Sequence, residues 1–80
     1  MEKDEIIEKL KKLKTLVDSS MHTIAIKGIF SLFEEIENSE TLTQSDKDDL
    51  KKELRNILSE NEKKYSWLQE QNSFLIYKIL

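Results

Sequence analysis

The residues best able to do chemistry lie together in one short segment, Asp18–His22. A carboxylate four residues before an imidazole, with two serine hydroxyls between them, supplies an orienting acid, a base and a nucleophile. The spacing is local and helical, however, and the sequence has no Gly-rich turn that could build an oxyanion site. We therefore interpret the segment as a capped helix start beside a partly exposed histidine, and we expect no catalytic residues and no enzyme.

Metal and cofactor sites are not expected either. The chain has no Cys and one His, so a structural zinc ion lacks a ligand set. Carboxylates are plentiful, but Asp46, Asp48 and Asp49 do not follow the calcium-loop pattern, which requires a glycine and a terminal glutamate at fixed positions. A phosphate loop is impossible with one glycine. The sequence predicts no metal and no cofactor.

The composition predicts a single all-α domain over residues 1–80. The sequence has no Pro and one Gly, and it is rich in Glu, Lys, Leu and Ile, which favour helices. Its 13 basic and 16 acidic residues give a net charge of −3, so no strong field attracts nucleic acid or anionic lipid. A chain this short has a marginal core, and without disulfides it gains stability by self-association or by binding a partner.

The sequence also favours a soluble, cytoplasmic protein. The first residues are acidic where a secretory signal would be basic and then apolar. The longest apolar-rich stretch, residues 24–33, is far shorter than the roughly 20 residues that span a bilayer. The absence of Cys is typical of a reducing compartment.

The clearest helical pattern covers residues 44–79. Thr43 can cap the helix, and Asp46 stands at its third position, where the positive end of the helix dipole stabilises an acidic side chain. One apolar stripe then runs along the helix: Leu50, Leu54, Ile57, Leu58, Tyr65, Leu68, Leu75 and Ile79. Asn61 and Asn72 interrupt this stripe. Asparagine in a helix seam fixes register or oligomeric state, and the alternative is that both lie at a wet edge.

Two shorter helices are predicted at about 3–17 and 20–38, and their apolar faces differ by roughly 110°. We place a kink or break between them, at Asp18-Ser19-Ser20. The first helix either continues in line, giving an antiparallel helical hairpin with a kinked or broken first arm, or folds back into a compact three-helix bundle. The bundle leaves the end of the long helix uncovered. A reversal without glycine is less common, so we favour the hairpin.

The second helix is apolar over much of its circumference, and a hairpin buries only one of its faces. Each large side chain left in water forfeits roughly 1.5–3 kcal/mol of burial, and such a patch normally marks an interface. We expect two hairpins to form a four-helix homodimer. Its interface residues are predicted to be Ile26, Ile29, Phe30 and Phe33.

A second surface is predicted near the C-terminal end, where Trp67 and Phe74 lie about 120° from the main stripe with Tyr77 nearby. Trp and Tyr are frequent binding anchors, so we predict that these three residues bind a partner protein. Alternatively, they cover the first helix or a second subunit. The leading hypothesis is a small homodimeric regulatory or inhibitory adaptor, of the accessory type found in phages and mobile elements.

Two other classes stay open. A helical-bundle nucleic-acid binder would use the one basic cluster, which a dimer could align into a ridge: Lys9, Lys11, Lys12 and Lys14. Net acidity and a single arginine argue against it. The other class is a structural subunit of a larger helical assembly.

Overall fold

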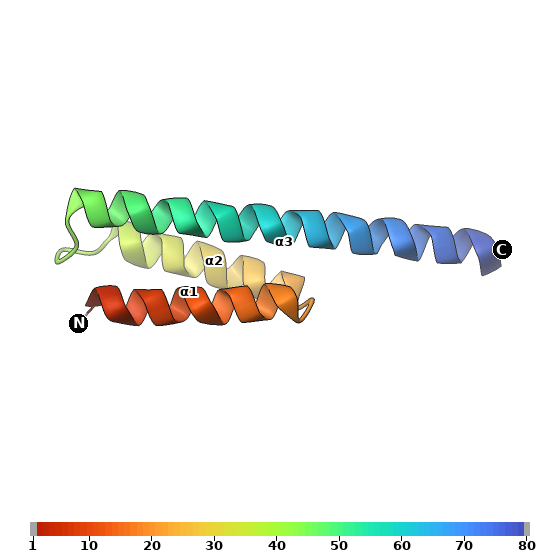
Figure 1. Cartoon of the computed structure of the whole chain (residues 1–80), viewed down its shortest axis with the longest axis horizontal. Coiled ribbons are helices and arrows are strands. Elements are labelled where there is room, and N and C mark those ends of the chain that lie inside the picture. Colours follow the sequence, from red (N-terminus) through yellow and green to blue (C-terminus); the bar gives the residue numbers. More distant parts are fainter. Residues whose placement is uncertain (1, 80) are drawn as a thin grey trace.

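The computed structural model consists of three α-helices that pack against one another (Figure 1). They are α1 (Glu2–Asp18), α2 (His22–Glu37) and α3 (Gln44–Ile79). The structure describes the backbone of residues 2–79 and the side chains of residues 2–67. No strand occurs in residues 2–79, so the all-α class is confirmed. The predicted helices at 3–17, 20–38 and 44–79 agree with these bounds to within two residues.

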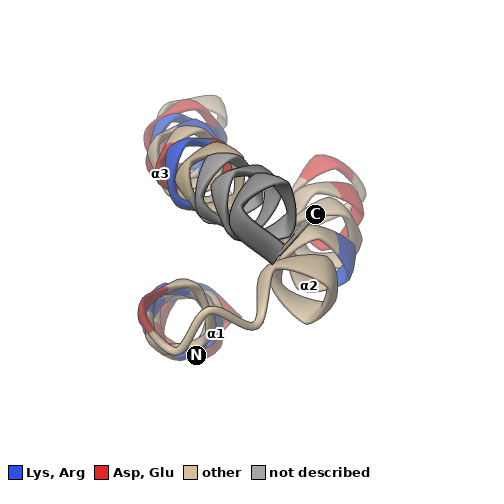
Figure 2. Cartoon of the chain, turned by 90° about the vertical axis from the view of Figure 1, so that its right-hand side faces the viewer, with Lys and Arg blue, Asp and Glu red and all other residues tan. Residues whose placement is uncertain are grey.

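The first helix folds back instead of continuing in line. α1 contacts both α2 and α3, and an end-on view places the three helices at the corners of a triangle (Figure 2). The favoured hairpin with a kinked first arm is therefore wrong, and the three-helix alternative is the one that forms. α3 has 36 residues against 17 in α1, so its backbone extends well past the turn between α1 and α2 (Figure 1).

The reversal after α1 uses a serine in a glycine-like conformation. Ser20 has a φ of 62°, in the left-handed region. Its N–H donates to the Val17 carbonyl at 3.1 Å, and the Met21 N–H donates to the Leu16 carbonyl at 2.9 Å. This pair of bonds is the Schellman motif, which ends a helix and satisfies its last carbonyls. The segment that we expected to cap the second helix thus ends the first, and α2 begins without a side-chain cap.

The core lies where one apolar face of each helix meets the other two. It consists of Ile6, Leu10, Leu13 and Val17 from α1, Ala25, Ile29, Leu32 and Ile36 from α2, and Leu50, Leu54 and Ile57 from α3. Gly28 allows α1 to approach α2 closely, because a Cβ at this position would lie 2.5 Å from the Leu13 Cδ2 atom. These contacts make a self-contained three-helix core. No helix among the described residues combines the length and apolar character needed to cross a membrane.

Polar contacts at the ends of the helices reinforce this arrangement. The predicted cap of α3 is confirmed, since the Thr43 Oγ1 atom accepts a hydrogen bond from the Asp46 N–H at 3.1 Å. The hydrogen bond from Lys3, followed by that from Thr43, holds the pKa of Asp46 below its ordinary value. Ion pairs also connect neighbouring helices: Lys3–Asp46 at 2.9 Å, Lys9–Glu35 and Lys64–Asp18 at 2.8 Å, and Lys51–Glu37.

Candidate interaction surfaces

A buried polar pair joins the start of α2 to the middle of α3. His22 is 5% exposed and Asn61 is fully buried. The His22 Nδ1–H donates to the Asn61 Oδ1 atom at 2.7 Å, and the Asn61 amide donates to the His22 carbonyl at 3.2 Å. An amide oxygen only accepts, so the His22 proton sits on Nδ1. The Tyr65 ring lies 5.5 Å from the His22 ring at 59°.

This pair bears on two predictions from the sequence: the asparagines that could fix register, and the acid and base that were considered for catalysis. Asn61 continues the buried row of α3 at the helical spacing of its core residues, and its partner is in the same chain. Asn72 lies outside the described side chains. Asp18 accepts a hydrogen bond from Lys64 at 2.8 Å, so the structure gives Asp18 and His22 different partners. Sequence reasoning missed the burial of His22, although its position four residues after Asp18 was noted.

An apolar groove of about 130 Å³ runs between α2 and α3 on the side away from α1, lined by Ile29, Phe30, Phe33, Leu54, Arg55 and Leu58. Phe30 borders this groove and is 60% exposed. Phe33 is half-buried, and the Lys51 ammonium lies 5.4 Å from the centre of its ring. Of the four residues predicted for a dimer interface, Ile29 is instead buried in the core of the single chain, while Ile26 is half-buried. Phe30 is thus the most exposed of the four.

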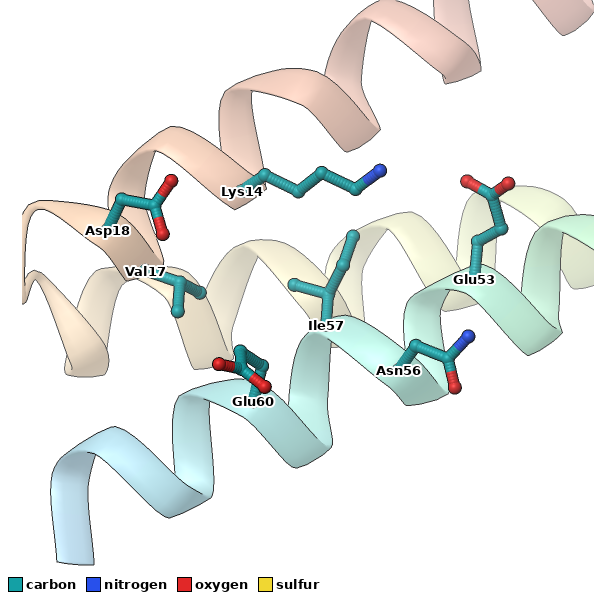
Figure 3. Close-up of a pocket in the computed structure, with 7 residues that line it drawn as sticks. All are labelled: Lys14, Val17, Asp18, Glu53, Asn56, Ile57 and Glu60. Carbon is teal, nitrogen blue, oxygen red and sulfur yellow. The ribbon is translucent and has the colours of Figure 1, made fainter. Parts of the chain in front are cut away.

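A second, larger groove of about 390 Å³ lies between α1 and α3 (Figure 3). Val17 and Ile57 are among its lining residues, and its charged and polar groups are Lys14 and Asp18 of α1 with Glu53, Asn56 and Glu60 of α3. Three carboxylates against one ammonium make the groove acidic. No three His, Cys, Asp or Glu side chains within residues 2–67 are placed to hold a metal ion. The groove exists because α1 folds back, so the favoured hairpin could not predict it.

The lysines considered for nucleic acid do not form a free basic ridge, and three of the four have acidic neighbours. Lys9 pairs with Glu35 at 2.8 Å, Lys11 pairs with Glu8 at 3.4 Å, Lys14 lines the acidic groove, and Lys12 is exposed. The hydrogen bond to Glu35 raises the pKa of Lys9. Much of the positive charge of these lysines therefore lies beside carboxylates of the same chain.

Two aromatic side chains lie on α3 near the end of the α1–α2 turn. Trp67 is 60% exposed and Tyr65 is 42% exposed. Tyr65 faces α2 through its contact with His22. Trp67 is two residues further on, about 200° around the helix, so it points away from α2. Phe74 and Tyr77, the other predicted anchors, lie outside the described side chains.

No protein-family model, curated protein or solved structure matches this chain. Any statement about its function therefore depends on its own residues and surfaces.

Proposed function

We propose that the chain is a non-catalytic protein–protein interaction module, acting as a small regulatory or inhibitory adaptor. The observation that supports this proposal is the exposure of large apolar side chains on a well-packed bundle: Ile24 is 52% exposed, and Phe30 and Trp67 are each 60% exposed. Leaving such side chains in water forfeits roughly 1.5–3 kcal/mol for each one that could be fully buried. Exposed aromatic residues beside a groove are typical of binding surfaces.

Because α1 folds back against α2 and α3, the chain depends less on a partner to bury its apolar side chains. A two-helix hairpin would leave much of α2 in water, whereas α1 completes a core that buries Ala25, Ile29, Leu32 and Ile36 of α2. The apolar surface left on α2 beside α3 is the strip of Ile26, Phe30 and Phe33. We therefore propose that the chain folds as a monomer and that its self-association is reversible.

Phe30 and Trp67 belong to two separate surfaces. Phe30 borders the groove between α2 and α3, and Trp67 points away from α2. Both surfaces can therefore be occupied at once. We assign the Phe30 side to self-association and the Trp67 side to a foreign protein.

The test for the foreign partner places a photo-reactive side chain at position 67 and, as a control, at exposed Ser59. A protein captured at position 67 but not at position 59 is then purified and titrated against variants by calorimetry. We expect Trp67→Ala to weaken binding by about 30-fold, which corresponds to about 2 kcal/mol for an anchor residue. Ile24→Ala, which removes a similarly exposed apolar side chain, should change the affinity less than about twofold.

Circular dichroism provides the folding control, because truncating an exposed tryptophan should leave the helix content unchanged. If Trp67→Ala unfolds the chain, Trp67 is a core residue. If both variants bind the captured protein equally well, the Trp67 surface is not the binding site. Either result contradicts the proposed function.

A further inference from the structure

We propose that two copies of this chain exchange their α1 helices, so that α1 of each copy packs against α2 and α3 of the other. The structure shows the closed chain, in which α1 packs on the helices of its own copy. Exchange goes beyond the proposed function, because it rearranges the core of the chain and does not join two surfaces of folded bundles. Domain swapping of this kind is a low-cost route from a monomer to a dimer.

The contacts of α1 are specific, and a second copy can make all of them. Leu13 fits the space that Gly28 leaves on α2, where a Cβ atom would lie 2.5 Å from the Leu13 Cδ2 atom. Three ion pairs also join α1 to the other helices: Lys3–Asp46 at 2.9 Å, and Lys9–Glu35 and Lys64–Asp18 at 2.8 Å. The α2 and α3 helices of a second copy present the same residues in the same places. Exchange therefore preserves the packing and the charge complementarity of the closed chain.

The turn after α1 is short, and one of its residues is strained. Residues 19–21 connect the two helices, and Ser20 has a φ of 62°, which is unfavourable for residues other than glycine. Short turns under strain favour domain swapping, because opening the turn releases the strain. Opening also breaks the hydrogen bonds from the Ser20 and Met21 N–H groups to carbonyls of α1. These groups regain partners in water or in a continued helix, since residues 2–27 contain no Gly and no Pro.

The apolar faces of α1 and α2 permit exchange but oppose an open monomer. Along a continuous helix the two faces differ by roughly 110°, so α1 in line with α2 does not face the α3 helix that α2 covers. An open monomer would therefore leave core residues of α1 in water. In the exchanged dimer, α1 and α2 of one copy belong to two different cores, each built from one α1, one α2 and one α3. The two faces then need not point at the same neighbour.

The open turn places the two cores end to end, on the side where α3 continues. Four Cα–Cα steps separate the last residue of α1 from the first residue of α2, a span of at most about 14 Å. Asp18 pairs with Lys64 and α3 ends at Ile79, so the α3 backbone continues about 22 Å past the end of α1 (Figure 1). Each α3 therefore runs beside the core of the other copy. Met21 and Tyr65, which are exposed in the closed chain, lie at this junction.

Exchange is slow, because α1 must leave one core before it joins another. The four core residues of α1 are buried in the closed chain, so its opening is a partial unfolding of the bundle. We expect exchanged dimers to form when the chain refolds at high concentration and to persist after dilution. Association through the surfaces of folded chains would instead reverse quickly. Slow dissociation therefore distinguishes exchange from the self-association assigned to the Phe30 side.

The test is chemical cross-linking of the variant Lys9→Cys/Glu35→Cys. The chain has no other Cys, and these two side chains meet across α1 and α2 in the closed chain. The variant is unfolded in urea, refolded at about 500 µM to favour association by mass action, and separated into monomer and dimer by gel filtration. Each fraction is then treated with a short bismaleimide. On a denaturing gel, the monomer should be linked internally and the dimer should be linked covalently, because position 9 of one copy lies beside position 35 of the other.

The matched control is Lys51→Cys/Glu37→Cys, which replaces an ion pair between α2 and α3. These two helices stay together in exchange, so this variant should be linked internally in both fractions. Variants of the turn test the role of strain. Ser20→Gly should lower the dimerisation constant about tenfold or more, and Ser20→Val should raise it by a similar factor, because each acts on two closed turns. Ser19 does not have a positive φ, so Ser19→Val should change the constant less than about threefold.

Each outcome supports or overturns the proposal. A chain that forms no dimer after refolding at about 500 µM overturns it. A dimer in which Lys9→Cys/Glu35→Cys is linked only internally overturns exchange in favour of a surface contact. Equal dimerisation of Ser20→Gly and the original chain overturns the role of the turn, even if Ser20→Val does not fold by circular dichroism. Capture of a foreign protein at position 67 is measured separately, so the two proposals fail independently.

Discussion

Replacing Asn61 by alanine measures how much the buried polar pair contributes to the stability of the bundle. Asn61 is fully buried, and its amide is the described hydrogen-bond partner of the His22 Nδ1–H. The variant leaves this N–H without an acceptor in a place that is almost closed to water. The His22 carbonyl loses one donor as well, although its place in the first turn of α2 gives it a helical partner.

The expected loss is large for a chain of this size. An unsatisfied buried donor costs about 1–3 kcal/mol, and the cavity left by the shorter side chain adds roughly 1 kcal/mol. A domain of 80 residues has about 4–12 kcal/mol of total stability. A loss of about 2–4 kcal/mol therefore lowers the Tm by roughly 8–30 °C.

The double variant His22→Phe/Asn61→Leu separates the polar pair from the packing around it. It removes both polar side chains and keeps an aromatic ring against Tyr65, 5.5 Å away in the original structure. Replacing both partners of a buried hydrogen bond by apolar groups of similar shape is nearly neutral. We expect the double variant to lie within about 1 kcal/mol of the original, while His22→Phe alone leaves the Asn61 amide unsatisfied and costs about 1–3 kcal/mol.

Urea denaturation followed by circular dichroism at a fixed low micromolar concentration measures these free energies. The low concentration keeps self-association from adding to the stability. The slope of the transition should be the same for all four proteins, because they bury similar surface. The reasoning is refuted if Asn61→Ala costs less than about 0.5 kcal/mol, or if His22→Phe/Asn61→Leu is destabilised as much as His22→Phe alone.

Two further predictions concern the turn after α1 and the ion pairs at the helix ends. Ser20→Gly should stabilise the chain by about 0.5 kcal/mol in urea denaturation, because glycine adopts a φ of 62° without strain. Ser19→Gly, where φ is not positive, should destabilise it, and equal effects would contradict the assignment. Lys51 holds the pKa of Glu37 below its ordinary 4.5, and Lys3 with Thr43 holds that of Asp46 below its ordinary 3.8. The stability from these pairs is present above those values and is lost as the pH falls through the lowered pKa values. The Tm should therefore fall in acid, and less steeply in Lys51→Met, whereas a Tm that is constant or rises in acid would contradict this.

The sequence predicted those parts of the fold that depend on neighbours along the chain. The spacing of Ile6, Leu10, Leu13 and Val17 defined the buried face of α1, and Thr43 marked the start of α3. Both are local properties, since a helix repeats about every 3.6 residues and its cap lies within one turn. The interruption of the α3 stripe at Asn61 was also visible in the spacing.

Features that need two distant segments could not be predicted in the same way. His22 was expected to be partly exposed, but it is buried because Asn61, 39 residues away, supplies a partner for its Nδ1–H. The acidic groove of Glu53 and Glu60 needs Asp18 and Lys14 beside them, and these arrive only when α1 folds back. A polar side chain can be buried when its partner is in place, and a sequence pattern does not show that partner.

The direction of α1 shows why the rarity of a turn is a weak guide to a fold. The in-line arrangement was favoured because a reversal without glycine is less common. The structure shows what that reversal costs: Ser20 adopts a positive φ, which is unfavourable by about 1–2 kcal/mol for a residue other than glycine. The four core residues of α1 are at most 5% exposed, and full burial of four such side chains gains roughly 6–12 kcal/mol. In line, these residues would contact one helix and keep part of their surface in water, whereas folding back gives them two neighbours. If the second neighbour supplies even a third of the burial, the gain of about 2–4 kcal/mol exceeds the cost at Ser20. The burial available to the whole helix, and not the preference of one turn residue, therefore decides where α1 lies.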